Sequence, residues 1–135
     1  MPWLIDSSLW IDFTRARSPR SVKHFIAPYI LAPEAALAEP IAYEVLRHAT
    51  EAEIPPIHAQ FQTMPMLSTP GDLWTTAARL GQNCRRKGIN ASSLDLLIVT
   101  VAIHHDAELV TFDRDFQSIA GVCEFRLKLL QHPNP

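Results

Sequence analysis

The chain opens with Pro2-Trp3-Leu4-Ile5, an apolar run that ends at Asp6. A second apolar run, Glu108-Leu109-Val110-Thr111-Phe112, ends in the same way at Asp113. Short apolar runs of this kind predict buried strands. In parallel α/β sheets, ligands bind in the crevice outside the carboxyl ends of the strands. We therefore expect Asp6 and Asp113 to face one crevice.

Around these two strands the chain alternates weaker strand candidates with helical patterns. Further strands are predicted at residues 35–38, 64–67 and 122–127, and Pro65 limits the second of these to a sheet edge. Helices are predicted at residues 9–13, 19–30, 40–48, 57–61, 72–87, 92–103 and 116–120. This alternation is typical of an α/β fold whose central parallel sheet, here of about four to five strands, is covered by helices on both faces. At 135 residues the whole chain, 1–135, fits a single domain.

Composition and charge exclude several classes of protein. Hydrophobic residues make up 47% of the chain, enough for a sizeable core, and the formal net charge is -2. A polycation is thereby excluded, so attraction for nucleic acid has to come from local basic patches or a bound metal. Cys84 and Cys123 fit buried thiols in a reducing compartment, with a disulfide left open. The start lacks signal-peptide features and no apolar stretch approaches about 20 residues, so a cytoplasmic enzyme or binding module is expected.

Two further acids are expected at the same edge of the sheet. Glu44 lies on a helix whose residues Ile41, Val45 and Leu46 indicate burial, and Asp95 lies near the start of a strongly apolar helix. At ~5 Å and an effective dielectric of ~20, each pair of carboxylates repels by roughly 3 kcal/mol. A chain tolerates such a cluster when a cation sits among the carboxylates, and ligands that are all oxygen favour Mg²⁺ or Mn²⁺.

Each acid also has an ordinary structural interpretation. Asp6 can cap the helix that follows it, and Ser92-Ser93-Leu94-Asp95 is similar to a capping box. Asp113 can cap the next helical turn, where the helix dipole favours Asp115, and Glu44 can simply be solvated. The joint placement of these residues at strand ends and helix starts is what favours a shared site.

Other catalytic patterns are missing from the sequence. It contains no G-x-x-x-x-G-K-[ST], G-x-G-x-x-G, H-E-x-x-H or G-x-S-x-G motif. The adjacent His104 and His105 would point apart on a helix and are interpreted as polar residues at a helix end. The carboxylates are therefore the chemical feature that the sequence singles out.

In their order and spacing, the acidic motifs resemble those of the PIN-domain ribonucleases, in particular the VapC-like toxins of toxin–antitoxin pairs. The resemblance spans nearly the whole chain through residues 4–12, 40–46, 94–99 and 109–116. Its most specific element is the Thr-x-Asp-x-Asp-Phe run from Thr111 to Phe116. The resemblance implies a three-layer PIN-like α/β fold. Residues 35–39 depart from the family pattern because they are rich in alanine rather than in β-branched residues.

The resemblance also implies which residues form the site. The catalytic acids would be Asp6, Glu44, Asp95 and Asp113, and the metal ligands would be Asp6, Asp95 and Asp113 with Asp115 as an accessory. Ser7 would match the Ser or Thr that supports the first aspartate. Residues that would steer phosphate are Arg15, Arg17, Arg20, Lys23, Arg79, Arg85, Arg86 and Lys87, each of which can equally belong to a solvated helix face.

What the resemblance implies for function is an endoribonuclease that depends on Mg²⁺ or Mn²⁺ and hydrolyses RNA through a metal-activated water. The protein would be the toxin of a toxin–antitoxin pair, with RNA as substrate and a cognate antitoxin as partner. A non-catalytic PIN-like module that binds RNA or a partner, or a PIN nuclease acting on another nucleic acid, stays open as the alternative.

A homodimer is expected as well. The predicted helices near residues 22–30 and 41–46 carry more apolar surface than one small sheet needs, including Phe25, Tyr29 and Tyr43. The alternative is that all three of these side chains enter the core of the monomer.

Overall fold

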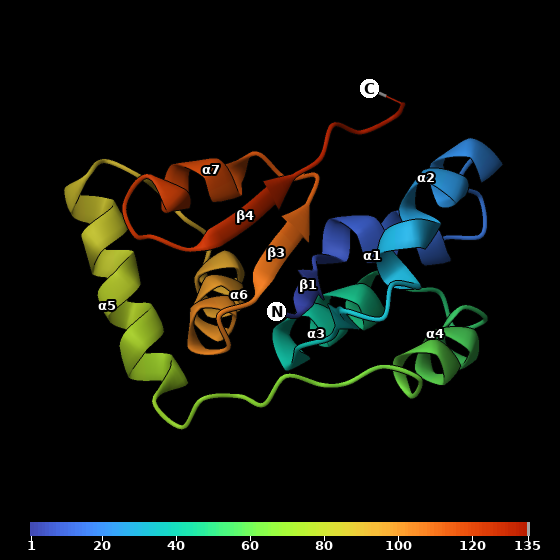
Figure 1. Ribbon diagram of the computed structural model, residues 1–135, viewed down its shortest axis with the longest axis horizontal. Coiled ribbons are helices and arrows are strands. Elements are labelled where there is room, and N and C mark those ends of the chain that lie inside the picture. Colours follow the sequence, from blue (N-terminus) through green and yellow to red (C-terminus); the bar gives the residue numbers. More distant parts are fainter. Residues whose placement is uncertain (135) are drawn as a thin grey trace.

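The computed structural model describes residues 1–134, which fold around a four-stranded parallel sheet (Figure 1). The strands are β1 (Trp3–Ile5), β2 (Ala35–Ala36), β3 (Glu108–Thr111) and β4 (Arg126–Leu129), and their order across the sheet is β2-β1-β3-β4. Each neighbouring pair of strands runs parallel. The expectation of an α/β fold with a central parallel sheet is thus confirmed.

Helices connect these strands and cover both faces of the sheet. They are α1 (Ser7–Thr14), α2 (Arg20–Ile30), α3 (Glu39–His48), α4 (Ile54–Phe61), α5 (Leu73–Arg86), α6 (Ser93–His104) and α7 (Asp115–Ala120). Crossovers between parallel strands run right-handed in nearly all sheets. From β1 the chain moves across the sheet to β2 on one side, whereas it later moves in the opposite direction to reach β3 and then β4. The connecting helices α1 and α2 therefore lie on one face of the sheet, and α6 and α7 lie on the other. This arrangement confirms the three-layer expectation.

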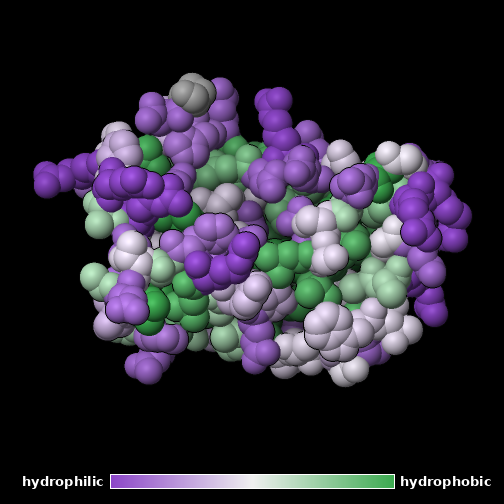
Figure 2. Space-filling view, turned by 180° about the vertical axis from the view of Figure 1, so that it is seen from behind, coloured by the Kyte–Doolittle hydropathy of each residue, from purple (hydrophilic) through white to green (hydrophobic). Residues whose placement is uncertain are grey.

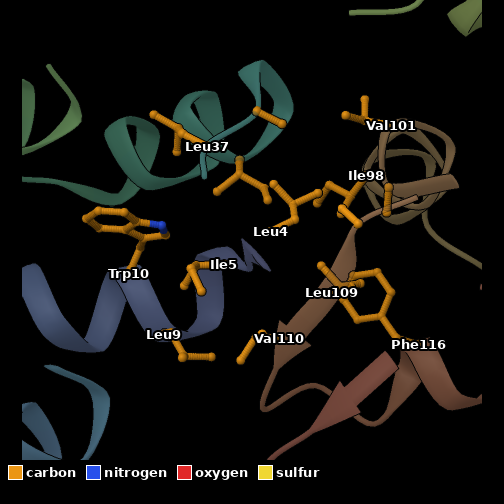
Figure 3. Packing of buried hydrophobic residues seen from close by; sticks show 14 of the residues in the cluster. Leu4, Ile5, Leu9, Trp10, Leu37, Ile98, Val101, Leu109, Val110 and Phe116 are labelled. Carbon is orange, nitrogen blue, oxygen red and sulfur yellow. The ribbon is translucent and has the colours of Figure 1, made fainter. Parts of the chain in front are cut away.

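Side chains from β1 and β3 fill the core on both faces because successive strand residues point in opposite directions. Leu4 is in register with Leu109, and Ile5 is in register with Val110. Figure 3 shows Leu4 beside Ile98 of α6, whereas Ile5 lies on the side of α1. All five side chains are fully buried. The two short strands are therefore held by packing on either side as well as by their hydrogen bonds.

The strand order reverses between β1 and β3. After β1 the chain crosses to β2 on one side, and it later returns to place β3 on the other side of β1. In open α/β sheets such a switch point, at the carboxyl ends of the strands, is where ligands bind. Asp6 follows β1 directly and Asp113 comes two residues after β3. The topology thus directs both aspartates to the predicted edge.

The strand predicted at residues 64–67 is reduced to one isolated bridge. In it, Leu37 donates its N–H to Pro65 O at 2.9 Å and accepts from Leu67 N at 2.7 Å. Pro65 has no N–H to donate, so the ladder does not extend along this segment. The sheet of the described residues consequently has four strands, the lower end of the expected range.

The last strand also begins later than predicted. It starts at Arg126 rather than at residue 122. The amides of Val122 and Cys123 both donate to the carbonyl of Ile119 at the end of α7, at 2.9 and 3.1 Å. Because these donors are used by the helix end, the apolar residues there cannot pair with β3.

Part of the apolar surface stays in contact with water. Figure 2 shows hydrophobic patches in the middle of the rear face, with hydrophilic side chains concentrated toward its upper and outer edges. Large exposed apolar side chains include Phe25, Leu31, Tyr43, Trp74 and Ile103. No helix within residues 1–134 has the length and apolarity that a membrane span requires.

The end of α5 is set by a glycine in the left-handed region of backbone space. Gly88 has a φ of +76°, and its N–H donates to Arg85 O at 3.0 Å while Ile89 N–H donates to Cys84 O at 2.9 Å. This pair of hydrogen bonds is a Schellman motif, which ends a helix and redirects the chain. The following loop leads to Ser92, the N-cap of α6, and so helps to bring Asp95 to the carboxyl edge of the sheet.

We expect Gly88→Ala to lower the free energy of unfolding by about 1 kcal/mol. A Cβ at this position meets nothing within 4 Å, so the cost arises from the left-handed backbone alone. Gly71→Ala is the matched control, because a Cβ there also meets nothing within 4 Å and the backbone is not left-handed. Urea denaturation should place this control within about 0.5 kcal/mol of the unmodified protein. Equal effects of the two substitutions would contradict the prediction.

Candidate active site

Four acids from four elements meet at the carboxyl edge of the sheet. Asp6 is the N-cap of α1, Glu44 lies in the second turn of α3, Asp95 is the third residue of α6, and Asp113 precedes α7. The helices α1 and α3 follow β1 and β2 and therefore begin at the carboxyl ends of these strands. Helix α6 begins at the same edge because it leads back to the amino end of β3. Asp113 reaches the edge through β3 itself.

Asp6 is anchored by hydroxyl groups from both β3 and α1. Its Oδ2 accepts hydrogen bonds from Thr111 Oγ1 at 2.7 Å, from Ser8 Oγ at 2.8 Å and from Ser8 N at 3.3 Å. The residue is only 3% exposed, and a carboxylate is costly to bury unless such donors satisfy it. These contacts cap α1 and fix the orientation of the carboxylate at the same time.

The serine expected to support Asp6 binds a different acid with its hydroxyl. The hydroxyl of Ser7 donates to Glu44 Oε1, and the hydroxyl of the next residue, Ser8, donates to Asp6. The reason is helical geometry: Ser7 and Ser8 are the first two residues of α1 and point in different directions, Ser7 toward α3 and Ser8 toward β3. Ser7 thus supports Asp6 through its backbone N–H, while its hydroxyl binds Glu44.

The tightest group of acids consists of Asp95, Asp113 and Asp115. Each offers one carboxylate oxygen, and the three oxygens lie within 4.8 Å of one another. The capping interactions foreseen for these residues exist in the same arrangement. Asp115 N donates to Asp113 Oδ1 at 2.9 Å, and Asp95 N donates to Ser92 Oγ at 3.1 Å. Capping and clustering are compatible because a carboxylate has more than one oxygen to offer.

The pKa values of two acids of the site, Asp95 and Asp6, are raised above their ordinary values. Burial, joined by the nearby charges of Asp113, Asp6 and Glu44, raises the pKa of Asp95 to about 6, against the hydrogen bond with Ser92, which lowers it. Burial likewise raises the pKa of Asp6, against the hydrogen bonds from Thr111 and Ser8. Asp95 therefore lies close enough to the other three predicted acids to be affected by their charges.

In the described part of the chain, no basic side chain forms an ion pair with an acid of the site. Among residues 1–134 the ion pairs are Arg126–Asp106 and His132–Asp12, neither of which involves an acid of the site. The available ligand atoms are carboxylate oxygens, the type preferred by hard divalent cations. Nitrogen and sulfur ligands, which would favour zinc or copper, do not take part in the group. The donor set therefore fits an ion such as Mg²⁺ or Mn²⁺.

The predicted basic residues fall into separate groups around this edge. Arg15 and Arg17 line a hollow of about 300 Å³ near the junction of α1 and α2, and Arg20 begins α2. Arg85 and Arg86 lie in the last turn of α5. Figure 1 places α2 and α5 toward opposite ends of the molecule.

The group on α5 lies next to a hollow that reaches the acids. This hollow, of about 260 Å³, begins at Gly88, passes Asn90 and Ser92, and includes Asp95 and Asp115. Arg86 also donates a hydrogen bond to Asn83 on its own helix, so part of its side chain is held along α5. Arg15 and Arg17 instead line a separate hollow, together with Asp12 and His132.

Sequence reasoning missed two residues that organise the site. Ser8 and Thr111 both donate to Asp6, and each also accepts a backbone N–H at the end of β3, from Phe112 at 3.1 Å and from Asp113 at 2.9 Å. Their positions in the Asp-Ser-Ser and Thr-x-Asp-x-Asp runs were the available signal. Because β1 and β3 are parallel neighbours, a hydroxyl at the end of β3 can donate a hydrogen bond to the aspartate that follows β1.

Comparison with known families gives a match over most of the chain. The family model described as "PIN domain" matches residues 3–122. Two curated relatives are "VapC ribonuclease Mb1587" of Mycobacterium bovis and "Ribonuclease VapC11" of Mycobacterium tuberculosis. Each is 32% identical over 125 residues, which is 88% of this chain and 92% of the relative.

Solved structures share the fold. VapBC2 from Rickettsia felis, bound to a DNA fragment from its promoter, aligns with a TM-score of 0.73 at 16% identity and covers 97% of this chain and 100% of that one. A toxin–antitoxin complex from Klebsiella pneumoniae aligns with a TM-score of 0.67 at 21% identity. The alignment covers 89% of this chain and 92% of that one. At these identities the structures support the architecture rather than any particular residue.

We expect the metal-free protein to lose stability as the pH rises from about 4 to 6. Asp95 has its pKa raised from 3.8 when unfolded to about 6 when folded, so the folded state binds more protons in this window. The resulting stability is fully present below pH 3.8 and is lost as the pH passes the folded value. The loss should be roughly 1–2 kcal/mol, since one pKa unit corresponds to about 1.4 kcal/mol and solvent screens part of the effect at this half-buried residue.

Urea denaturation in EDTA at several pH values measures this effect. Asp95→Asn should make the decline shallower because the amide does not titrate, while Asp6, whose pKa is also raised by burial, keeps its own contribution. Asp106→Asn is the matched control, because Asp106 is an exposed carboxylate paired with Arg126 away from the acids, and this variant should keep the decline. A decline that is just as steep in Asp95→Asn would contradict the assignment of the effect to Asp95.

Proposed function

This chain belongs to the PIN-domain family, and we propose that it is a divalent-metal-dependent endoribonuclease acting as the toxin of a toxin–antitoxin pair. One observation carries the proposal: five acids gather at the topological switch point of the sheet, and within residues 1–134 no basic side chain forms an ion pair with them. The name "ribonuclease" of the 32% identical relatives supports RNA as the substrate.

Within this proposal the acids have different roles in binding the metal. Asp95, Asp113 and Asp115 offer the closest oxygens and would form the core of the ligand set, with Asp6 beside them. Glu44, held by Ser7, would complete the acidic wall on the side of α3. When bound, Mg²⁺ or Mn²⁺ would lower the pKa of a coordinated water and stabilise negative charge on the phosphodiester oxygens.

Rigid support of the acids by the protein is the second requirement. Thr111 and Ser8 fix one oxygen of Asp6 by short hydrogen bonds, and Ser8 ties this arrangement to the backbone of Phe112. Because these partners are buried or half-buried, the carboxylate cannot turn away to relieve repulsion. The site is therefore preorganised for a cation, as metal-dependent hydrolysis requires.

Basic residues would guide the RNA toward this acidic edge. The chain has a net charge of -2, so attraction has to be local. Arg85 and Arg86 are the better placed of the predicted residues, because the hollow that starts just beyond them leads to Asp95 and Asp115. Arg15, Arg17 and Arg20 would contact more distant phosphates.

We also propose a homodimer and an antitoxin partner. Phe25 and Tyr43 are 36% and 59% exposed, so these two side chains do not enter the monomer core. Tyr29 is half-buried and packs against Trp3 with ring centroids 5.7 Å apart. One solved structure of similar fold is a toxin–antitoxin complex from Klebsiella pneumoniae, which supports a protein partner for this chain as well.

We expect purified protein to cleave single-stranded RNA with Mg²⁺ or Mn²⁺, to stop in EDTA, and to recover when Mn²⁺ is added. Asp113→Asn should lower kcat/KM at least 100-fold, because a ligand of the metal is lost. Asp106→Asn is again the control, since it removes one negative charge on the surface and should leave cleavage unchanged. Binding of RNA without cleavage in any metal would contradict the nuclease and favour a binding module.

We expect sedimentation equilibrium at micromolar concentration to give the mass of a dimer. Phe25→Glu together with Tyr43→Glu should shift the mass to that of a monomer, because charge would enter an apolar interface. Trp74→Glu is the control, because Trp74 is 72% exposed on α5, away from the helices assigned to the interface. A monomeric mass of the unmodified protein without antitoxin would refute the dimer.

A further inference from the structure

We propose that a hollow beside the acidic cluster binds one unpaired nucleobase of the RNA substrate. This inference rests on the proposed function and adds to it the position at which the RNA is recognised. The hollow has a volume of about 440 Å³ and is lined by Phe112, Arg114, Leu129, Leu130, Gln131 and His132. Its volume lies in the range of roughly 300–1,000 Å³ that is typical of small-molecule sites.

The wall of the hollow is built by the chain that follows β4. Leu130 N donates to Thr111 O at 2.8 Å, which continues the pairing of β4 with β3 and aligns the next residues with Phe112. The ring of His132 then packs on Phe112 with centroids 4.7 Å apart and an angle of 58° between the planes. His132 Nε2 also donates to Asp12 Oδ2 at 2.7 Å, so the imidazole is fixed from both sides.

Two residues that line the hollow lie next to an acid of the site along the chain. Phe112 and Arg114 are the two chain neighbours of Asp113. Phe112 N donates to Ser8 Oγ, which in turn donates to Asp6 Oδ2. A nucleotide whose phosphate lies at the carboxylates would therefore have its own base, or the next one, within reach of the two aromatic rings.

The chemistry of the lining suits a base attached to a phosphate. Bases stack on aromatic side chains in single-stranded RNA recognition, and leucine side chains exclude water from the stack. Arg114 is exposed and forms no ion pair among residues 1–134, so its guanidinium is available to a phosphate between the base and the acids. A plain apolar peptide would leave this cation without a partner. A base paired in a duplex cannot leave its stack freely, so the target nucleotide has to be unpaired.

The test uses an RNA whose cut site has been mapped with the unmodified protein and Mn²⁺. Oligoribonucleotides carrying this site are made with one abasic nucleotide at each position flanking the cut. We expect one abasic position to lower kcat/KM about tenfold, the size of effect that loss of one base–aromatic stack produces. If no abasic position lowers kcat/KM, the inference is overturned.

Variants of the hollow then identify where that base binds. His132→Ala and Phe112→Leu should each lower kcat/KM about tenfold on intact RNA and have little further effect on the sensitive abasic RNA. His132→Phe keeps a ring in place and should restore cleavage of intact RNA. Trp74→Leu removes an exposed ring elsewhere and should behave as the unmodified protein on both RNAs.

Other outcomes overturn the inference while leaving the nuclease intact. Normal cleavage of intact RNA by both His132→Ala and Phe112→Leu would do so, as would equal losses on intact and abasic RNA. Normal cleavage combined with weaker binding of the cognate antitoxin would assign the hollow to a protein segment instead.

A binding measurement separates failure of this inference from failure of the proposed function. Should the protein cleave no RNA in any metal, the nuclease proposal fails. A short single-stranded RNA containing 2-aminopurine then decides the inference, since stacking quenches the fluorescence of this base. Quenching by the unmodified protein that is lost in His132→Ala would support the base site, and equal quenching by both would overturn it.

Discussion

The hydrogen bonds of the Asp6 carboxylate connect the fold to the site. Thr111 Oγ1 donates to it from the end of β3, and Ser8 donates to it from the first turn of α1. An unsatisfied carboxylate at 3% exposure would be strongly destabilising, so these donors make its burial possible. The same contacts hold the ends of β1 and β3 together at the switch point, where the remaining acids arrive.

Helix capping and metal binding draw on the same geometry in this protein. An aspartate between a strand and a helix satisfies the first N–H groups of the helix, and at that place it also stands at the carboxyl edge of a parallel sheet. Asp6 and Asp113 both do this, and Asp95 enters the edge from the start of α6. The structural and functional interpretations of these acids are therefore not exclusive, and removing the carboxylate of Asp6 or of Asp113 affects both.

Local patterns in the sequence were sufficient for much of the architecture. The runs before Asp6 and Asp113 form β1 and β3, the helical patterns form helices, and Gly88 ends α5 as its backbone requires. These features depend on residues within a few positions of one another. The two acids that follow strands could be placed for the same reason, since a strand end fixes the edge at which the next residue lies.

Contacts between distant segments decided the rest, because short sequence patterns do not specify which segments meet. Only the packing of α1 against both α3 and β3 assigns Ser7 to Glu44 and Ser8 to Asp6. Likewise, the register of β4 on β3 moves the last strand beyond its apolar start and brings His132 to Phe112. The sequence by itself determined the carboxylates and the strands that carry them, whereas the tertiary structure determined their hydroxyl partners and the hollow beside them. The physical reason is that contacts between segments far apart in the chain, such as the hydrogen bond from Thr111 to Asp6, form only after the sheet has paired.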